Sequence, residues 1–237
     1  MRRHLQLATA SLLLITGAMA TPAQTHFPQL NREKKQTEDL QWLWQYAAPT
    51  PTGNENGLIN DPRLLPLLKQ HLTAPQTFWG DPATGRPYGS LADTALDFLS
   101  TPGKVIADDN RYLTIDGCVS HFCPDRGLLF IDLGAPHPLV AFAAIDWITE
   151  NKTPDQSEAE YTLWLFANRA LNPDRIPSAL VRSIARWTAE PLADSKTIEH
   201  ITNAILVDPD GQPHQIAPAT IGANTITRQQ TDQKAHP

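Results

Sequence analysis

The spacing of apolar positions changes near Lys104, and this change divides the chain into a helical part and a strand-rich part. In the first part apolar residues recur every three or four positions, which indicates short amphipathic helices. These helices are expected over residues 38–48, 61–72 and 90–99. Asp61 before Pro62 is expected to cap the second helix, and Ser90 with Asp93 forms a variant of the capping box before the third.

From Lys104 onward, runs of apolar and β-branched residues predict strands. The candidate strands are residues 104–106, 111–115, 126–132, 139–145 and 161–166. Their connections are too short to hold crossover helices, so consecutive strands should pair antiparallel. A helix is expected over 177–189, followed by two strand segments on either side of the turn at Asp208–Gly211. The expected fold class is therefore α+β, with an antiparallel β-sheet flanked by helices.

The N-terminus has the pattern of a cleavable export signal. Met1–His4 is basic, an apolar run follows around Leu12–Ile15, and Ala18–Ala20 has the A-x-A form of a signal-peptidase site. The apolar run is too short to span a bilayer, and no cysteine lies near the cut to carry a lipid anchor. We therefore expect export into an oxidising compartment, with no membrane anchor.

The expected organisation has four parts. Residues 1–20 are the signal peptide and 21–98 are an extension of helices and loops. Residues 99–222 form the α+β domain, which ends in a helix and a hairpin, and 223–237 are a polar, disordered tail.

The charge of the chain restricts its partners. Removal of residues 1–20 takes away Arg2 and Arg3, so Lys and Arg fall from 19 to 17 against 25 Asp and Glu, and the net charge goes from -6 to -8. Nucleic acids and anionic membranes reward basic surfaces, so we expect neither as a partner. An acidic surface favours a basic protein partner, although ordinary solubility explains it equally well.

Both cysteines of the chain lie in one short segment, Cys118-Val119-Ser120-His121-Phe122-Cys123. Because exported cysteines are normally oxidised, we expect a disulfide that closes this segment into a ring, with the loop projecting between two strands. His121 would then lie near the tip of a loop with few conformations.

The residues alone leave four interpretations of this ring open. In the first interpretation the disulfide is purely structural and staples a turn. Closing so small a loop stabilises a fold by about 2 kcal/mol, which by itself would account for the two cysteines. A metal site would need a further ligand, such as His137, and thiol exchange normally uses a Cys-x-x-Cys spacing. In the fourth interpretation the loop is a rigid recognition element, which loses little entropy on binding. A hydrolase using His121 with Asp116 or Asp132 lacks a nucleophile or metal set, so we expect no enzyme activity.

The ring and its flanks resemble the Ivy family, bacterial periplasmic inhibitors of vertebrate, c-type lysozyme, whose loop reads Cys-Lys-Pro-His-Asp-Cys. Tyr112–Ile115 before the ring, Arg126–Asp132 after it and Val140–Asp146 in the next strand are similar to the family's flanking strands. The resemblance covers about Leu99–Phe166, under a third of the chain. The two cysteines with histidine at the fourth position are its most specific element.

The resemblance implies a periplasmic inhibitor that inserts the loop into a lysozyme-type active site, with Val119, Ser120, His121 and Phe122 as partner-binding residues. The implied target is c-type lysozyme or an endogenous lytic transglycosylase, with no cofactor and no metal. Val119, Ser120 and Phe122 replace the family's Lys, Pro and Asp. The alternative is an exported structural or interaction domain whose disulfide only staples a turn. A homodimer is left open as the assembly.

Overall fold

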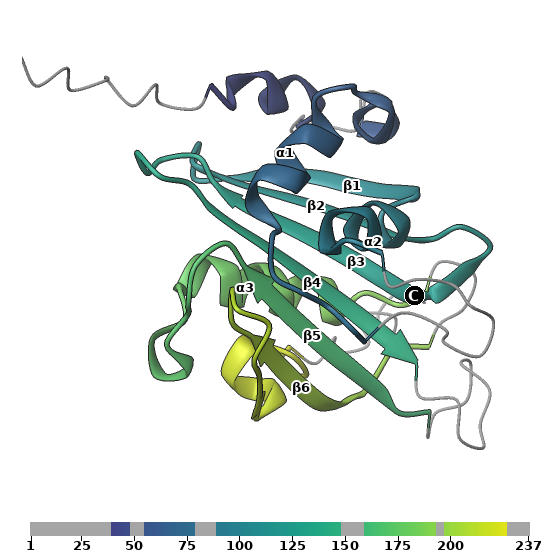
Figure 1. Ribbon diagram of the computed structural model, residues 1–237. Coiled ribbons are helices and arrows are strands. Elements are labelled where there is room, and N and C mark those ends of the chain that lie inside the picture. The colour runs from purple at the N-terminus through teal and green to yellow at the C-terminus, as the bar shows by residue number, and fades with distance from the viewer. Residues whose placement is uncertain (1–38, 48–54, 79–88, 148–158, 193–196, 227–237) are drawn as a thin grey trace, which may run out of the picture. The chain divides into compact units, whose positions relative to one another are not determined.

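A computed structural model of the chain describes residues 39–47, 55–78, 89–147, 159–192 and 197–226 (Figure 1). The expected signal peptide, the start of the extension and most of the expected tail lie outside the described residues and stay predictions. Within the described part, no helix combines the length and the apolar character needed to cross a membrane.

Seven strands form a single sheet in sequence order, β1 to β7. The strands are β1 (Thr101–Asp108), β2 (Tyr112–Val119), β3 (Phe122–Asp132), β4 (Leu139–Trp147), β5 (Tyr161–Ala167), β6 (Ile201–Val207) and β7 (Pro213–Ile216). All neighbouring strands pair antiparallel except β5 and β6, which pair parallel. A helix lies in the connection between those two strands, and such a crossover brings the chain back to run in the same direction. The expected α+β class with an antiparallel sheet is confirmed, with this one parallel pair.

In the described part of the chain, three α-helices and four short 3-10 helices accompany the sheet. They are η1 (Gln41–Tyr46), η2 (Glu55–Asn60), α1 (Leu64–His71), α2 (Leu91–Phe98), η3 (Pro173–Arg175), α3 (Ser178–Thr188) and η4 (Pro218–Ile221). Ser90 caps α2 as expected: its Oγ accepts from the Asp93 amide at 3.1 Å. The expected cap of α1 is wrong. Asp61 instead accepts from the Arg63 amide and guanidinium and from the Tyr46 hydroxyl, and the helix begins only at Leu64.

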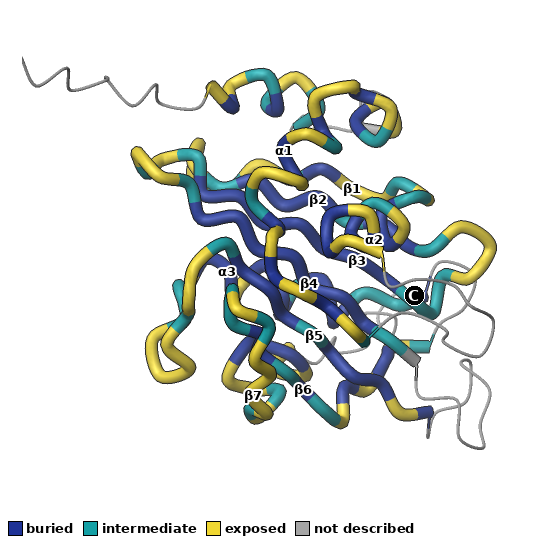
Figure 2. The backbone as a smooth tube through the Cα atoms, in the orientation of Figure 1, coloured by how far each residue is buried: buried dark blue, intermediate teal, exposed yellow. Residues whose placement is uncertain are grey.

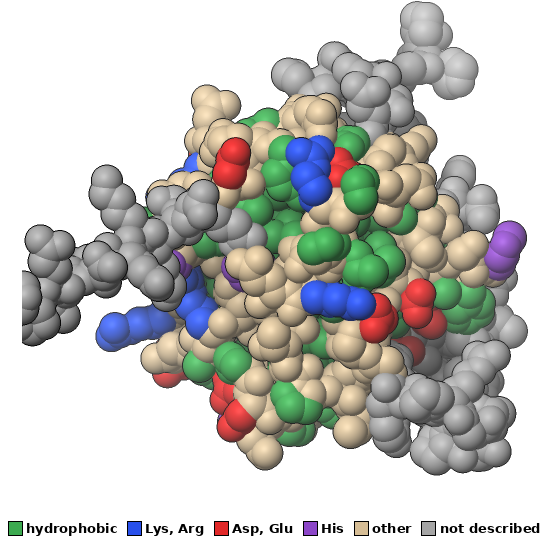
Figure 3. Space-filling model, turned by 45° about the horizontal axis from the view of Figure 1, so that its top comes forward, with side chains coloured by type: hydrophobic (Ala, Val, Ile, Leu, Met, Phe, Trp, Pro, Cys, Tyr) green, Lys and Arg blue, Asp and Glu red, His purple; other side chains and the backbone are tan. Residues whose placement is uncertain are grey.

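The sheet is buried on both faces, which explains the almost continuous apolar runs of its central strands (Figure 2). Successive residues of β3 alternate between two cores. Leu129 and Ile131 belong to the core with α1 and α2, whereas Leu128 and Phe130 belong to the core with α3. Figure 1 shows α1 and α2 in front of the sheet and α3 behind it. On the face seen in Figure 3, basic side chains of the described residues are scattered among acidic and uncharged ones.

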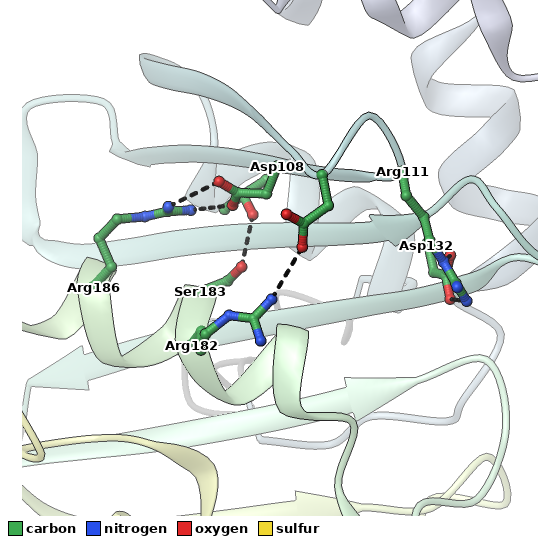
Figure 4. Close-up of polar contacts among 8 residues, drawn as sticks. Asp108, Arg111, Asp132, Arg182, Ser183 and Arg186 are labelled. Carbon is green, nitrogen blue, oxygen red and sulfur yellow. Dashed lines mark hydrogen bonds and ion pairs between the residues drawn. The ribbon is translucent and has the colours of Figure 1, made fainter.

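Helix α3 fixes the end of the sheet at the β1–β2 turn. Arg186 contacts Asp108 with its closer nitrogen at 2.8 Å, and Arg182 contacts Asp109 at 3.3 Å (Figure 4). The two arginines of this helix therefore lie against the turn, while its apolar face is buried. These contacts hold the β2–β3 hairpin from the end opposite to the cysteine ring.

Candidate functional site

The cysteine ring forms the connection between β2 and β3. Val119 pairs with Phe122, which leaves Ser120 and His121 as the two residues of the turn. The predicted disulfide between Cys118 and Cys123 is present, with the two Cα atoms 4.9 Å apart. The ring therefore closes a hairpin whose strands are already paired below it.

The tip of the loop presents a histidine in a conformation that favours glycine. His121 has a φ of 65°, in the left-handed region. For a residue with a side chain this region costs roughly 1–2 kcal/mol, and glycine avoids that penalty. Backbone strain of this kind is typical of functional positions, where the role of the side chain outweighs the conformational cost. The loop thus keeps an imidazole at a position where glycine would be more stable.

The four predicted partner-binding residues do not share one environment. Ser120, His121 and Phe122 are exposed, and Phe122, at 37%, is one of the large apolar residues that the described surface leaves uncovered. Val119 is half-buried and packs against the core of α1 and α2. The surface available to a partner is therefore the tripeptide 120–122, supported from below by Val119.

Ser100, between α2 and β1, anchors the turn. Its hydroxyl donates to the Asp97 carbonyl at 2.7 Å and accepts from the Ser120 amide at 2.9 Å. The loop is thereby tied to the end of α2 as well as to its own strands. Sequence reasoning missed this residue, because a single serine at a helix end carries no signal for a contact twenty positions away.

Two glycines allow the end of α2 to lie directly on the hairpin below the ring. Gly117 and Gly127 face each other on β2 and β3. A Cβ atom on Gly117 would lie 2.8 Å from the Thr101 carbonyl oxygen, and one on Gly127 would lie 2.8 Å from the Phe98 Cβ. Side chains at these positions would push the helix away. The base of the loop is therefore packed backbone against backbone.

A cavity of about 280 Å³ lies beside the ring and is lined by both cysteines. The Lys104 amide donates to the Asp116 carboxylate at 2.5 Å, and the Lys104 ammonium lies 2.6 Å from the Glu190 carboxylate. Burial raises the pKa of Asp116, and nearby Glu190 adds to this effect, whereas Lys104 and Arg126 act against it. The cavity therefore holds acidic and basic groups that largely compensate each other.

Asp132 and His137 lie far from the loop. Asp132 pairs with Arg111, at 2.7 and 2.8 Å, near the far end of β3 (Figure 4). Ten residues of strand separate it from Phe122, which is roughly 30 Å. His137 lies in the connection beyond that end. Asp132 therefore does not orient His121, and His137 cannot complete a metal site at the ring.

Asp116 bonds to the backbone of β1, about 10 Å along β2 from the turn. Among the described residues no group of three or more His, Cys, Asp or Glu side chains could hold a metal ion. The loop tip is suited to contact with another molecule, because it presents an exposed imidazole and an exposed phenyl ring on a covalently closed turn.

No protein-family model, no curated protein and no solved structure matches the chain. The likeness to the Ivy family thus rests on the residues of the ring and its flanking strands. These residues occupy the β2–β3 hairpin and β4 of the structure.

Proposed function

We propose that the protein is an exported inhibitor of a lysozyme-type peptidoglycan hydrolase and acts by inserting the Cys118–Cys123 loop into the active-site cleft. The observation that carries the proposal is the loop tip, where a disulfide-closed turn holds the exposed His121 in the left-handed region. The strands and the Ser100 contact below the turn support the same view, because they restrict the direction in which the imidazole points.

The chemistry of the target fits such a loop. Glycosidases of this class use two carboxyl groups that flank the scissile bond. An imidazole can donate hydrogen bonds to carboxylates, and its protonated form adds charge attraction. His121 would bind between the two carboxyl groups and exclude the sugar. Phe122 beside it would fill an adjacent apolar sugar subsite.

Rigidity and charge would strengthen the interaction. A loop closed by a disulfide loses little conformational entropy on binding, so its few contacts translate efficiently into affinity. The chain has a net charge of -6, and removal of the expected signal peptide would make it -8. An acidic inhibitor approaches a basic enzyme faster than a neutral one would.

The test is inhibition of cell-wall lysis by purified mature protein, with c-type lysozyme and a lytic transglycosylase as separate targets. His121→Ala should weaken inhibition by about 2–5 kcal/mol, the range for losing a buried charged partner. His121→Gly should weaken inhibition equally without lowering the free energy of unfolding, because glycine relieves the left-handed strain. His137→Ala, which removes another exposed histidine at the opposite end of the hairpin, is the matched control and should inhibit like the wild type.

Failure to inhibit either enzyme at micromolar excess would leave the stapled-turn alternative. A loss below about 0.5 kcal/mol for His121→Ala, within the range of ordinary surface substitutions, would show that the histidine is not the key group.

A further inference from the structure

An ion pair is buried beneath the disulfide loop. Arg126 on β3 lies directly opposite Cys118 of the ring, and its guanidinium contacts the carboxylate of Glu199, which precedes β6. The side chains of Arg126 and Glu199 are 9% and 0% exposed. The pair joins residues 73 positions apart, and it connects the base of the loop with the far part of the chain.

The guanidinium also contacts the end of α3. Its Nη1 donates to the Glu190 carbonyl at 3.3 Å, and its carbon lies 5.3 Å from the centre of the Trp187 ring. The pair is nevertheless incompletely hydrogen-bonded: Nε of Arg126 and Oε1 of Glu199 have no hydrogen-bond partner among the described residues. A buried ion pair with unsatisfied atoms contributes little to stability, because desolvation offsets the attraction. Because Arg126 stays charged when Glu199 is protonated, the pair opens only where the guanidinium gains other charged partners.

The cavity beside the ring offers the guanidinium a second position. Arg126 lines this cavity together with both cysteines, Asp116 and Glu190. These two carboxylates already contact Lys104, which supplies one positive charge against their two negative ones. A guanidinium released from Glu199 would keep its charge and could turn toward them, since arginine stays protonated throughout the physiological range.

We propose that the Arg126–Glu199 ion pair is a latch that couples proton uptake by Glu199 to the rigidity of the disulfide loop. With Glu199 ionised, the guanidinium is held under the loop and fixes β3 opposite Cys118. With Glu199 protonated, the guanidinium moves toward Asp116 and Glu190, and the base of the ring loosens. The inference deepens the proposed function, on which it rests, by adding regulation of the same loop.

Burial raises the pKa of Glu199 from 4.5 to about 7, even though Arg126 acts in the opposite direction. The folded protein therefore takes up this proton as the pH falls through about 7, whereas the unfolded chain does so only near 4.5. The resulting contribution to stability is complete below pH 4.5 and is lost as the pH rises through 7. Acidification thus opens the latch while the fold itself is favoured.

Charged groups near Glu199 and near the cavity lined by Arg126 come from several elements. Asp125, next to Arg126 on β3, adds to the rise in the pKa of Glu199. Lys104 of β1, Asp116 of β2 and Glu190 beyond α3 surround the cavity, and the exposed His200 follows Glu199 directly. A pH effect must therefore be assigned to Glu199 by substitution, because the pH alone does not single it out.

The test uses the free protein, with no enzyme present. The ¹³C shift of the Glu199 carboxyl group gives its titration, and hydrogen-exchange protection factors report the rigidity of loop residues 119–122. Protection of the loop should fall about fivefold, equivalent to 1 kcal/mol, between about pH 8.5 and about pH 5.5. Glu199→Gln mimics the protonated acid and should give the low protection at both pH values. Glu160→Gln, the same change at an exposed position just before β5, should behave like the wild type.

Titration of Glu199 below about pH 5.5 would overturn the proposal, because its proton would then be taken up only near the ordinary range of glutamate. Equal loop protection in the wild type and in Glu199→Gln at both pH values would overturn it as well. Inhibition assays distinguish the two proposals: a protein with a working latch that inhibits neither hydrolase would remove the proposed function alone. Inhibition with an inert Glu199 would remove the latch alone.

Discussion

Removal of the Cys118–Cys123 disulfide distinguishes a recognition loop from a stapled turn, because the two roles predict different losses of stability and of binding affinity. The double variant Cys118→Ala/Cys123→Ala is preferable to a reductant, which would also reach any disulfides of the target enzyme. Alanine avoids placing a hydroxyl group at Cys118, which is buried. The hairpin should persist, since β2 and β3 remain paired from Gly117–Gly127 to the far end.

The size of each loss follows from the structure. The disulfide closes a loop of sequence separation 5, so the entropy of the unfolded chain gives about 2 kcal/mol in the free energy of unfolding. Binding has a separate requirement, because the tip must be ordered in the complex. Freeing the two residues His121 and Phe122 would cost about 2–4 kcal/mol on binding. The dissociation constant should therefore rise roughly 30-fold to 1000-fold.

Urea unfolding and inhibition titrations measure the two quantities on the same samples. Leu180→Ala in the buried face of α3 is the control, since it should lower stability by about 2–5 kcal/mol without touching the loop. We expect this control to inhibit normally and the ring variant to inhibit poorly. A ring variant that loses stability but keeps its dissociation constant within about threefold, below 1 kcal/mol, would show that the disulfide only staples the turn.

Two further contacts at the base of the loop give predictions. Gly127→Ala should lower the free energy of unfolding by about 1–3 kcal/mol, because the new Cβ meets the backbone and Cβ of Phe98. Gly89→Ala is its control: the atom nearest to the new Cβ is the Thr94 hydroxyl oxygen at 3.8 Å, so urea unfolding should change by less than about 0.5 kcal/mol. Equal effects of the two would contradict the close packing. Ser100→Ala should weaken inhibition about fivefold by removing the acceptor for the turn amide, and an unchanged inhibition constant would exclude this anchoring role.

The sequence predicts those parts of the fold that depend on local pattern. The Ser90 cap and the helix over 177–189, observed as α3, are confirmed, because side-chain spacing and capping act within one or two turns. The apolar runs predicted as strands are confirmed as β3, β4 and β5 for a related reason: strands that are buried on both faces contain few polar residues. The disulfide follows from cysteine spacing and the expected compartment.

Contacts between distant segments escape such reasoning. The ion pair of Arg126 with Glu199 joins β3 to a residue outside any element, so no periodicity marks it. The Ser100 contact with the loop is missed for the same reason. Asp61 was expected to begin α1, yet its carboxylate is shared by Arg63 and the hydroxyl of Tyr46. The contacts with the nearby Arg63 and the more distant Tyr46 thus outweigh the capping preference there.

The left-handed conformation of the loop histidine lies between these two cases. The ring predicts a tight turn, but the sequence does not say which residue takes the positive φ. The structure assigns it to His121 rather than to Ser120. The residue that the resemblance singled out for contact with the enzyme is therefore also the one whose backbone departs from ordinary geometry.

The central claim is that the loop around His121 enters the cleft of a lysozyme-type enzyme. Calorimetric titration of the mature protein into c-type lysozyme, with the cleft either empty or filled by a chito-oligosaccharide, tests it most directly. The account predicts binding to the empty enzyme and loss of that binding when the sugar occupies the cleft. Equal affinity for the filled and the empty enzyme, or no binding to either, would contradict it.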